Sequence, residues 1–329
     1  MIDLHNSCIL YREFGEPLDV LNIESKPITP LRSGEIRARM KLAPINPSDL
    51  IPIYGHYAHR IALPQIAGYE GVAEICEVGQ GVNASLLGQR ILPLRGEGTW
   101  QQLITLPAEN TVLIPDEISD IAAAQLYINP LTAWLICHEA FQLKAGDILI
   151  VNAANSAIGK IFAQLSRQLG VKMIAVVRRP QPALLELGVW AVIDSSKEVV
   201  LEQVLKLSEG KGADYAIDLI GGPQGTELAM SVAEQGRFIV LGLFSGKPVD
   251  WLFTHTHLKI ITGMFHLRMW NAKASKDQWH KVLNHVISMV KNKQLVLQEE
   301  GDIFAMNDLQ LAIQVSQIKR GERKVFLSF

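Results

Sequence analysis

Residues 147–180 read DILIVNAANSAIGKIFAQLSRQLGVKMIAVVRRP, and this stretch predicts the central unit of the fold. Residues 148–151 are a short, wholly apolar run, as expected of a strand buried on both faces of a parallel sheet. Residues 152–159 are small and polar, so the chain can turn tightly there. Apolar side chains then recur at helical spacing until Gly170, which suits a left-handed helix cap, and residues 173–177 form a second apolar run. The pattern predicts a strand–helix–strand unit of a parallel sheet.

The turn and the start of the helix form an imperfect dinucleotide-binding fingerprint. With the last glycine of G-x-G-x-x-G at Gly159, Ala154 and Ser156 stand at the first two glycine positions. Small residues still allow backbone to approach a ligand closely, and the free N–H groups of a helix start favour an anion. We therefore expect five residues to bind cofactor phosphates: Asn155, Ser156, Ala157, Ile158 and Gly159.

The end of the second strand indicates which dinucleotide is bound. About 20 residues past the turn, an NAD-binding unit carries an Asp or Glu for the ribose hydroxyls. This chain has Arg178 and Arg179 there instead, and guanidinium groups suit a 2′-phosphate. The alternative is two solvated arginines at a strand end. We predict NADPH as the cofactor.

The composition sets limits on partners and location. The chain has 329 residues, enough for two domains with large cores, and a net charge of −2 gives no reason to expect nucleic acid or a membrane surface as partner. The best apolar run, residues 121–137, is interrupted by Gln125, Asn129 and Pro130 and is not expected to cross a bilayer. The N-terminus lacks a basic region before an apolar core, and three scattered cysteines are too few for a disulfide framework. The predicted location is the cytoplasm.

Periodicity divides the chain near residue 120. Residues 35–42 alternate apolar and charged side chains, which predicts a half-buried strand, whereas strands and helices alternate from residue 121 to about 267. Further strands are expected at 71–78, 90–94, 99–106, 191–193, 215–220, 238–243, 259–265 and, returning to the first domain, 324–329. Helices are expected at 182–188, 197–209, 224–234, 276–291 and 307–317. We predict a β-rich domain from residues 1–122 and 268–329, and a doubly wound α/β domain from residues 123–267.

One short motif, Gly68-Tyr69-Glu70-Gly71, together with this domain order carries a family resemblance. The chain resembles the medium-chain dehydrogenase/reductase superfamily, whose zinc-dependent alcohol dehydrogenases have Gly-His-Glu here, so a zinc-ligand histidine has become Tyr69. The closely spaced cysteines of the structural-zinc lobe are missing as well. The resemblance implies the zinc-free branch, with a Rossmann sheet inserted into a GroES-like catalytic domain. Neither histidine pair, His56/His59 or His255/His257, has the partners of a tetrahedral metal site, and we expect no metal.

Several further segments narrow the resemblance to mitochondrial-type trans-2-enoyl thioester reductases. They are Pro44-Ile45-Asn46-Pro47-Ser48-Asp49, Gly55-His56-Tyr57, Gly98-Thr99-Trp100, Asn129-Pro130-Leu131-Thr132-Ala133, Asn152-Ala153-Ala154-Asn155-Ser156, Gly221-Gly222, and Leu258-Lys259 followed by Gly263. Quinone reductase-like families share several of these segments. By resemblance, the expected assembly is a homodimer through the last Rossmann strand.

The resemblance implies roles for individual residues. Tyr57 matches a tyrosine beside the nicotinamide and the substrate carbonyl, with Tyr54 as a fallback, and an aromatic wall is the alternative for Tyr57. Asn46 is expected near the nicotinamide or in a structural role, whereas Asp49 is expected to cap the following helix. Thr132 is expected near the nicotinamide, with helix capping as the ordinary explanation.

Other residues are expected around the two ligands. Gly242 and Phe244 are assigned to the cofactor. Phe265 and Trp270 follow the last Rossmann strand, where the family lines its acyl pocket, and core aromatics are the alternative. Glu70 has no evident partner in the sequence and is given a structural role. The basic run 319–324 is expected to be a solvated turn or a contact for coenzyme A phosphates or an acyl carrier protein.

Together these features predict NADPH-dependent reduction of an activated carbon–carbon double bond, with a trans-2-enoyl thioester as the expected substrate. In this mechanism hydride is added to the β-carbon, and the Tyr57 hydroxyl stabilises the enolate that develops on the thioester oxygen. The first alternative is a zinc-free quinone or enone reductase. The second is an NADPH-binding protein without turnover.

Overall fold

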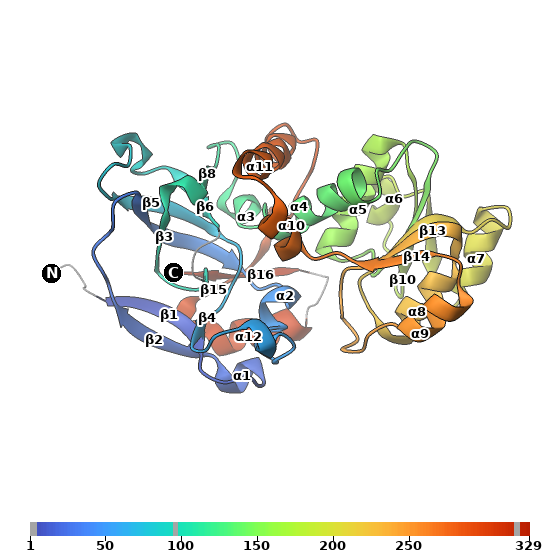
Figure 1. The fold of residues 1–329 in the computed structure, drawn as a ribbon, viewed down its shortest axis with the longest axis horizontal. Coiled ribbons are helices and arrows are strands. Elements are labelled where there is room, and N and C mark those ends of the chain that lie inside the picture. The colour runs from blue at the N-terminus through green and yellow to red at the C-terminus, as the bar shows by residue number, and fades with distance from the viewer. Residues whose placement is uncertain (1–4, 95–97, 319–322) are drawn as a thin grey trace. The chain divides into compact units, whose positions relative to one another are not determined.

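A computed structural model of the chain describes residues 5–94, 98–318 and 323–329. The chain divides into two compact units, which are coloured by position along the chain in Figure 1. One unit combines Met1–Ile128 with His280–Phe329, and the other is Asn129–Trp279. The second unit is thus inserted into the first. Its boundaries, 128/129 and 279/280, lie six and twelve residues later than the expected 122/123 and 267/268.

The inserted unit contains one parallel sheet of six strands in the described residues. The strands are β9 (Ile148–Asn152), β10 (Lys172–Val177), β11 (Ala191–Asp194), β12 (Ala213–Asp218), β13 (Val232–Val240) and β14 (Ile261–Met264). Their order is β11-β10-β9-β12-β13-β14. The chain thus adds strands on one side of β9 first and on the other side, beginning with β12, afterwards. This is the doubly wound topology, in which ligands bind at the carboxyl ends of the strands beside the switch point.

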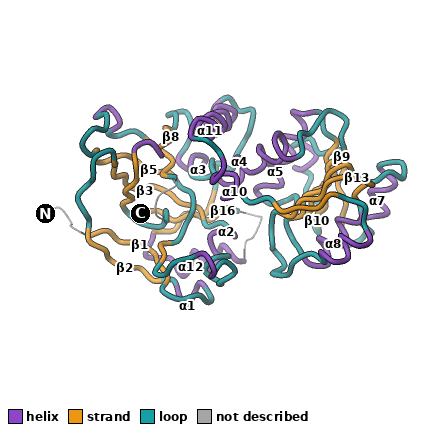
Figure 2. Tube along the Cα trace, in the orientation of Figure 1, coloured by secondary structure: helices purple, strands orange, loops and turns teal. Residues whose placement is uncertain are grey.

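Helices connect these parallel strands, as Figure 2 shows by colour. They are α5 (Ala157–Leu169), α6 (Ala183–Glu186), α7 (Val200–Leu207), α8 (Gly222–Met230) and α9 (Trp251–His257), and a further helix, α10 (Leu267–Lys273), follows the last strand. The chain enters the unit through α4 (Ile128–Leu135), which continues as the π-helix η4 (Ile136–Ala140). Ile150, Ile174 and Phe238 belong to the apolar core between the sheet and its helices.

The outer unit is rich in antiparallel strands. One sheet has the order β2-β1-β4, from β2 (Asn22–Pro27), β1 (His5–Tyr11) and β4 (Gln65–Ile66). The larger sheet contains β15 (Gly301–Ala305), β16 (Lys324–Ser328), β3 (Glu35–Pro44), β5 (Val72–Val78), β6 (Arg90–Pro93), β8 (Thr111–Leu113) and β7 (Leu103–Pro107), which pairs with β3. The α-helices are α1 (Pro17–Val20), α2 (Pro47–Leu50), α3 (Asp120–Ala123), α11 (Lys276–Lys291) and α12 (Leu309–Ile318). Short 3₁₀ turns are η1 (Ala58–Arg60), η2 (Ala84–Leu86), η3 (Ala108–Asn110) and η5 (Met306–Asp308).

The predicted return of the C-terminal strand is confirmed. β16 pairs in parallel with β15 and antiparallel with β3, so the last residues complete the sheet that residues 35–44 begin. Two sequence expectations are wrong. The helix expected at 224–234 ends at Met230, because β13 already starts at Val232. The strand expected at 99–106 begins only at Leu103.

The start of β13 falls in a predicted helix because its first half lacks the apolar–polar alternation of a strand. Glu234, Gln235 and Gly236 interrupt the apolar pattern, and Gln235 has a φ of 64°. The pairing register with β12 shifts at this place, between Ala213 and Tyr215. An irregular strand start of this kind carries no period-2 signal.

In the described part of the chain, no helix is long and apolar enough to span a bilayer.

Candidate active site

The phosphate-binding turn expected between β9 and α5 has the geometry of an anion site. Ser156 is the N-cap of α5, and its hydroxyl accepts a hydrogen bond from the Gly159 N–H at 3.2 Å. Ala157 and Ile158 occupy the first two helical positions, where backbone N–H groups have no intrahelical acceptor. A Cβ on Gly159 would lie 2.5 Å from the Ala154 carbonyl oxygen, so only glycine allows this close packing. The helix therefore begins directly behind the turn, with its positive dipole end toward the carboxyl edge of the sheet.

Asn152 and Asp218 brace the two strands on either side of the switch point. Asn152 ends β9 and Asp218 ends β12, and Asn152 Nδ2 donates to Asp218 Oδ1 at 2.6 Å. The Leu219 N–H donates to Asn152 Oδ1, and the Gly221 N–H donates to Asp218 Oδ2. Burial raises the pKa of Asp218, while these hydrogen bonds oppose the shift. This pair was not predicted from the sequence, although a polar residue that closes each of two apolar strands is a usable signal.

Arg178 and Arg179 lie at the carboxyl end of β10, on the side of β9 away from β12. Both side chains are exposed, and neither guanidinium has a hydrogen bond or ion pair with any residue between 5 and 94, 98 and 318, or 323 and 329. Asn155 in the turn donates from Nδ2 to the Arg179 carbonyl oxygen at 2.8 Å. The structure thus joins the turn to the arginine pair and leaves two positive charges available to a ligand.

Gly242 and Phe244 follow β13 at the same edge of the sheet. The Gly242 N–H donates to the Asp218 carbonyl oxygen at 3.2 Å, and a Cβ at Gly242 would lie 2.4 Å from the Leu219 carbonyl oxygen. Phe244 is 44 % exposed. The structure therefore brings Gly242 beside the switch-point brace and leaves the Phe244 ring accessible. The small-residue turn, the helix start and the exposed arginine pair fit a phosphorylated dinucleotide.

A cluster of buried polar side chains lies in the outer unit. Lys324 Nζ donates to Asn46 Oδ1 at 2.6 Å, and Asn46 Nδ2 donates to Glu70 Oε1 at 2.8 Å. Asp49 accepts from the N–H groups of Asn46 and Tyr69 at 2.7 and 3.0 Å. Glu70 Oε2 accepts from the N–H of Ile128, the first residue of α4. The cluster links the start of α2, the Gly68–Glu70 segment, β16 and the point where the chain leaves this unit.

Burial controls ionisation in this cluster. It raises the pKa of Asp49 to about 7, against the lowering effect of the Asn46 N–H bond and the Lys324 charge. It also raises the pKa of Glu70 and lowers that of Lys324, in each case opposed by the opposite charge nearby. One ammonium faces two carboxylates, so a proton shared among these groups would relieve the excess negative charge.

Two sequence-based assignments in this region need correction. Glu70 is not a lone carboxylate, because Asn46 and Ile128 both donate to it. Lys324 does not belong to a solvated turn but is buried in β16. Its ammonium is attracted by the nearby carboxylates of Glu70 and Asp49. Residues 319–322 of the basic run lie outside the described residues, and Arg323 forms an ion pair with Asp302. Asp49 does take part in helix capping, but from within α2: it is the third helical residue and accepts from the N–H of Asn46, which is the N-cap.

The two tyrosines of the Gly55-His56-Tyr57 region differ in their contacts. Tyr57 is partly buried just before η1, and the Arg60 guanidinium carbon lies 3.7 Å from its ring centroid. The Tyr54 hydroxyl accepts a hydrogen bond from Gln317 Nε2 at 3.0 Å. Stacking on Arg60 fixes the Tyr57 ring. Tyr54 instead fastens its loop to α12.

The remaining predicted residues lie in or near helices of the inserted unit. Thr132 is buried as the fifth residue of α4, so it does not cap a helix start as the ordinary explanation supposed. Trp270 lies in α10 and donates from Nε1 to Glu139 Oε2 at 2.9 Å. Phe265 follows β14 and is only partly buried. Neither aromatic ring belongs to a closed core.

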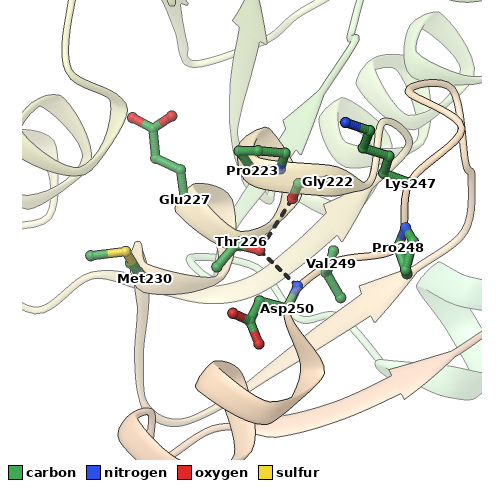
Figure 3. Close-up of a pocket in the computed structure, with 9 residues that line it drawn as sticks. All are labelled: Gly222, Pro223, Thr226, Glu227, Met230, Lys247, Pro248, Val249 and Asp250. Carbon is green, nitrogen blue, oxygen red and sulfur yellow. Dashed lines mark hydrogen bonds between the residues drawn. The ribbon is translucent and has the colours of Figure 1, made fainter.

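A pocket of about 590 Å³ lies elsewhere in the inserted unit, between the start of α8 and the segment before α9. Figure 3 shows the residues around it, with Thr226 bonded to the Gly222 carbonyl and the Asp250 N–H. Lys247, Glu227 and Asp250 give it mixed charge. It contains none of the residues predicted for cofactor or substrate.

Comparison with known proteins agrees with this architecture. Residues 32–116 match the "Alcohol dehydrogenase GroES-like domain" family, and residues 157–288 match "Zinc-binding dehydrogenase". The human protein "Enoyl-[acyl-carrier-protein] reductase, mitochondrial" is 29% identical over 319 residues, covering 94% of this chain and 84% of the human one. The Caenorhabditis elegans protein of the same name is 30% identical over 298 residues, covering 88% and 86%. The crystal structure of a "putative NADPH:quinone reductase" from Bacillus thuringiensis is 47% identical, with a TM-score of 0.96 over 99% of this chain and 100% of that one.

A parallel doubly wound sheet inserted into a GroES-like unit, with a nucleotide-binding turn at the switch point, defines a two-unit oxidoreductase. The chain belongs to the medium-chain dehydrogenase/reductase superfamily, so the resemblance seen in the sequence and the expected fold class are confirmed.

The donor set does not fit the zinc that one family description implies. Tyr69 stands where the ligand histidine of zinc-dependent members is expected, and its side chain is 50 % exposed. Glu70 already accepts hydrogen bonds from Asn46 and Ile128. Within the described ranges, no three His, Cys, Asp or Glu side chains are grouped so as to hold a metal ion. His257, from one of the two histidine pairs, stacks on Phe253.

Proposed function

We propose that this oxidoreductase uses NADPH to reduce an activated carbon–carbon double bond, and that its substrate is a trans-2-enoyl thioester. The observation that carries the proposal is the pairing of a phosphate-binding turn with the exposed Arg178 and Arg179 at the next strand end. The curated relatives are named as enoyl reductases, which supports the choice of substrate.

In this proposal the inserted unit supplies the contacts to the cofactor phosphates. The N–H groups of Ala157 and Ile158 face the pyrophosphate at the start of α5, while Arg178 and Arg179 neutralise the 2′-phosphate. Gly242 leaves room beside the Asn152–Asp218 brace, and Phe244 and Thr132 are assigned to the nicotinamide end. When bound, NADPH supplies a hydride. The remaining chemistry is left to side chains.

Tyr57 is proposed as the group that stabilises developing charge. Addition of hydride to the β-carbon moves negative charge onto the thioester oxygen, and a phenol O–H donated to that oxygen lowers the barrier. The contact with Arg60 supports this role because it fixes the ring before substrate arrives. Asn46 is proposed to act as a positioning residue, since its buried carboxamide is bonded to Glu70 and Lys324. Phe265 and Trp270 remain the proposed acyl contacts.

A second candidate, reduction of a quinone or another enone, is favoured by one specific observation. The Bacillus thuringiensis protein shares 47% of its residues with this chain and is described as a putative NADPH:quinone reductase. The same hydride machinery serves both reactions. The two reactions differ in how much the oxygen that gains negative charge must be stabilised. A quinone oxygen depends less on a hydrogen-bond donor than a thioester oxygen does.

The experiment that separates these candidates is cofactor consumption by the purified full chain, measured with NADPH and with NADH against crotonyl-CoA and a simple quinone. We expect the highest kcat/KM for NADPH with crotonyl-CoA. Turnover of the quinone alone would establish the second candidate. Tight NADPH binding without turnover of either substrate would identify a binding protein.

Partner and location remain predictions. The acyl group is proposed to arrive on coenzyme A or on an acyl carrier protein. A cytoplasmic location was expected from the sequence, whereas the curated relatives are named as mitochondrial.

A further inference from the structure

Within the described residues, only one end of the Asn155 carboxamide forms a hydrogen bond. Its Nδ2 donates to the Arg179 carbonyl oxygen at 2.8 Å. A carbonyl oxygen can only accept, so the partner fixes which end of the amide faces Arg179. The other end, Oδ1, is buried and accepts no hydrogen bond from the residues that the structure describes.

The segment that Asn155 holds would otherwise have little to fix it. β10 ends at Val177, whose carbonyl oxygen still accepts from the Ser195 N–H at 2.8 Å. Arg178 and Arg179 then extend into solvent, and Pro180 has no N–H to offer. Proline also biases Arg179 toward an extended backbone. The carbonyl of Arg179, bonded to Asn155, is therefore a fixed point just beyond the last strand residue.

The bond spans two parts of the proposed cofactor site. Asn155 belongs to the turn that precedes α5, next to the N-cap Ser156. A second link between the turn and β10 is a longer bond from the Ala154 N–H to the Val176 carbonyl oxygen at 3.4 Å. These two hydrogen bonds thus fix the position of the phosphate-binding turn relative to the arginine pair before any ligand binds. Groups that are already in place need not be ordered during binding, which raises affinity.

We infer that Asn155 is a specificity-determining positioning residue, which fixes Arg179 for recognition of the 2′-phosphate by bonding its backbone rather than the cofactor. The inference rests on the proposed use of NADPH. Asn155 should then contribute to the preference for a 2′-phosphate and leave binding of the pyrophosphate nearly unchanged. A residue that merely stabilises the turn would weaken NADPH and NADH alike.

The test measures dissociation constants, by calorimetry or cofactor fluorescence, for NADPH, NADH, 2′,5′-ADP and 5′-ADP. The variants are Asn155→Ala and Asn155→Ser, whose hydroxyl is too short to reach the carbonyl, and each is checked for its thermal midpoint. Asn292→Ala is the matched control, because it removes an exposed Asn hydrogen bond just after the end of α11. Arg179→Ala and the double variant Asn155→Ala/Arg179→Ala complete a thermodynamic cycle.

We expect Asn155→Ala to weaken NADPH and 2′,5′-ADP about threefold to tenfold, the scale of one hydrogen bond. NADH and 5′-ADP should change less than twofold, and the selective loss should vanish when Arg179 is already alanine. If both Asn155 variants keep the wild-type ratio of NADPH to NADH affinity, or weaken both cofactors equally, the positioning role is overturned. If the wild-type protein itself shows no preference for the 2′-phosphate, the proposed cofactor and this inference both fail.

Discussion

Tyr57 is proposed to contribute to the chemistry, whereas the buried group around Lys324 contributes to the stability of the fold. Tyr57 is partly accessible, the Arg60 guanidinium lies over its ring, and its hydroxyl is the group proposed to meet the substrate. Lys324 is buried among Asn46, Glu70 and Asp49 and stabilises the fold that carries Tyr57. The two roles predict different responses to substitution.

Removing the Tyr57 hydroxyl should impair chemistry without impairing cofactor binding. Tyr57→Phe keeps the ring and its stacking on Arg60 but removes the proposed donor. We expect kcat with crotonyl-CoA to fall by about 10²–10³, the scale for one oxyanion donor, with the NADPH dissociation constant unchanged. Tyr54→Phe is the matched control, since it removes a neighbouring tyrosine hydroxyl that accepts a hydrogen bond from Gln317. Near-full activity of Tyr57→Phe would reduce Tyr57 to an aromatic wall.

Removing the Lys324 charge should destabilise the protein in a pH-dependent way. Lys324→Met leaves Glu70 and Asp49 without their ammonium, and loss of one partner of a buried pair costs about 3–5 kcal/mol of unfolding free energy. The pKa of Asp49 is already about 7 because of burial. Without the ammonium, both carboxylates should hold protons to still higher pH.

The penalty should therefore be largest at pH 8.5, where the carboxylates must ionise, and smaller at pH 5.5, where the folded state can keep them protonated. Denaturant unfolding at both pH values measures it. The control is Lys197→Met, because Lys197 is 79% exposed and its ion pair with Asp194 should contribute little. A penalty that is the same at both pH values would show that the variant loses packing rather than a charge partner.

At the scale of elements, the turn between β9 and α5 depends on glycine at one position. Gly159→Ala would place a Cβ 2.5 Å from backbone atoms of Ala154, so α5 must shift away from the turn. We expect a loss of about 1–3 kcal/mol in unfolding free energy and clearly weaker NADPH binding. Gly263→Ala in β14 is the control, because a Cβ there meets nothing within 4 Å. Normal NADPH affinity in Gly159→Ala would show that the helix start does not set the phosphate site.

How far these elements could be predicted depends on whether local pattern or distant contact defines them. β9, α5 with its cap at Gly170, and β10 follow directly from apolar runs and helical spacing in residues 147–180. The first half of β13 and the strand β1 did not show an interpretable period. The partners of Glu70 could not be predicted either, because Asn46 and Lys324 are distant in sequence and meet only in the folded sheet.

At the scale of the whole molecule, the inserted sheet ends in a strand that could pair with another chain. β14 is an edge strand of the six-stranded sheet as far as the structure describes it. Ile261 and Met264 in this strand are 53% and 73% exposed, and Leu252 in α9 is 74% exposed. Exposed apolar side chains on an unpaired edge favour association. They support the proposal of a homodimer through β14.

Light scattering after size exclusion should therefore give twice the mass of one chain. Met264→Lys should shift the protein toward monomer at micromolar concentration, because a charge would have to be buried at the interface. Leu311→Lys is the control, since Leu311 is similarly exposed on α12 of the outer unit. A wild-type protein that runs as a monomer would contradict the proposed assembly.

The central claim, hydride addition to the β-carbon of an enoyl thioester, is tested most directly by isotope transfer. NADPH carrying deuterium at the transferable C4 position is incubated with the full chain and crotonyl-CoA, and the product is examined by NMR. We predict butyryl-CoA with one deuterium at the β-carbon and a solvent proton at the α-carbon. Absence of deuterium from the thioester product, with NADPH oxidised and hydroquinone formed when a simple quinone replaces crotonyl-CoA, would contradict the account.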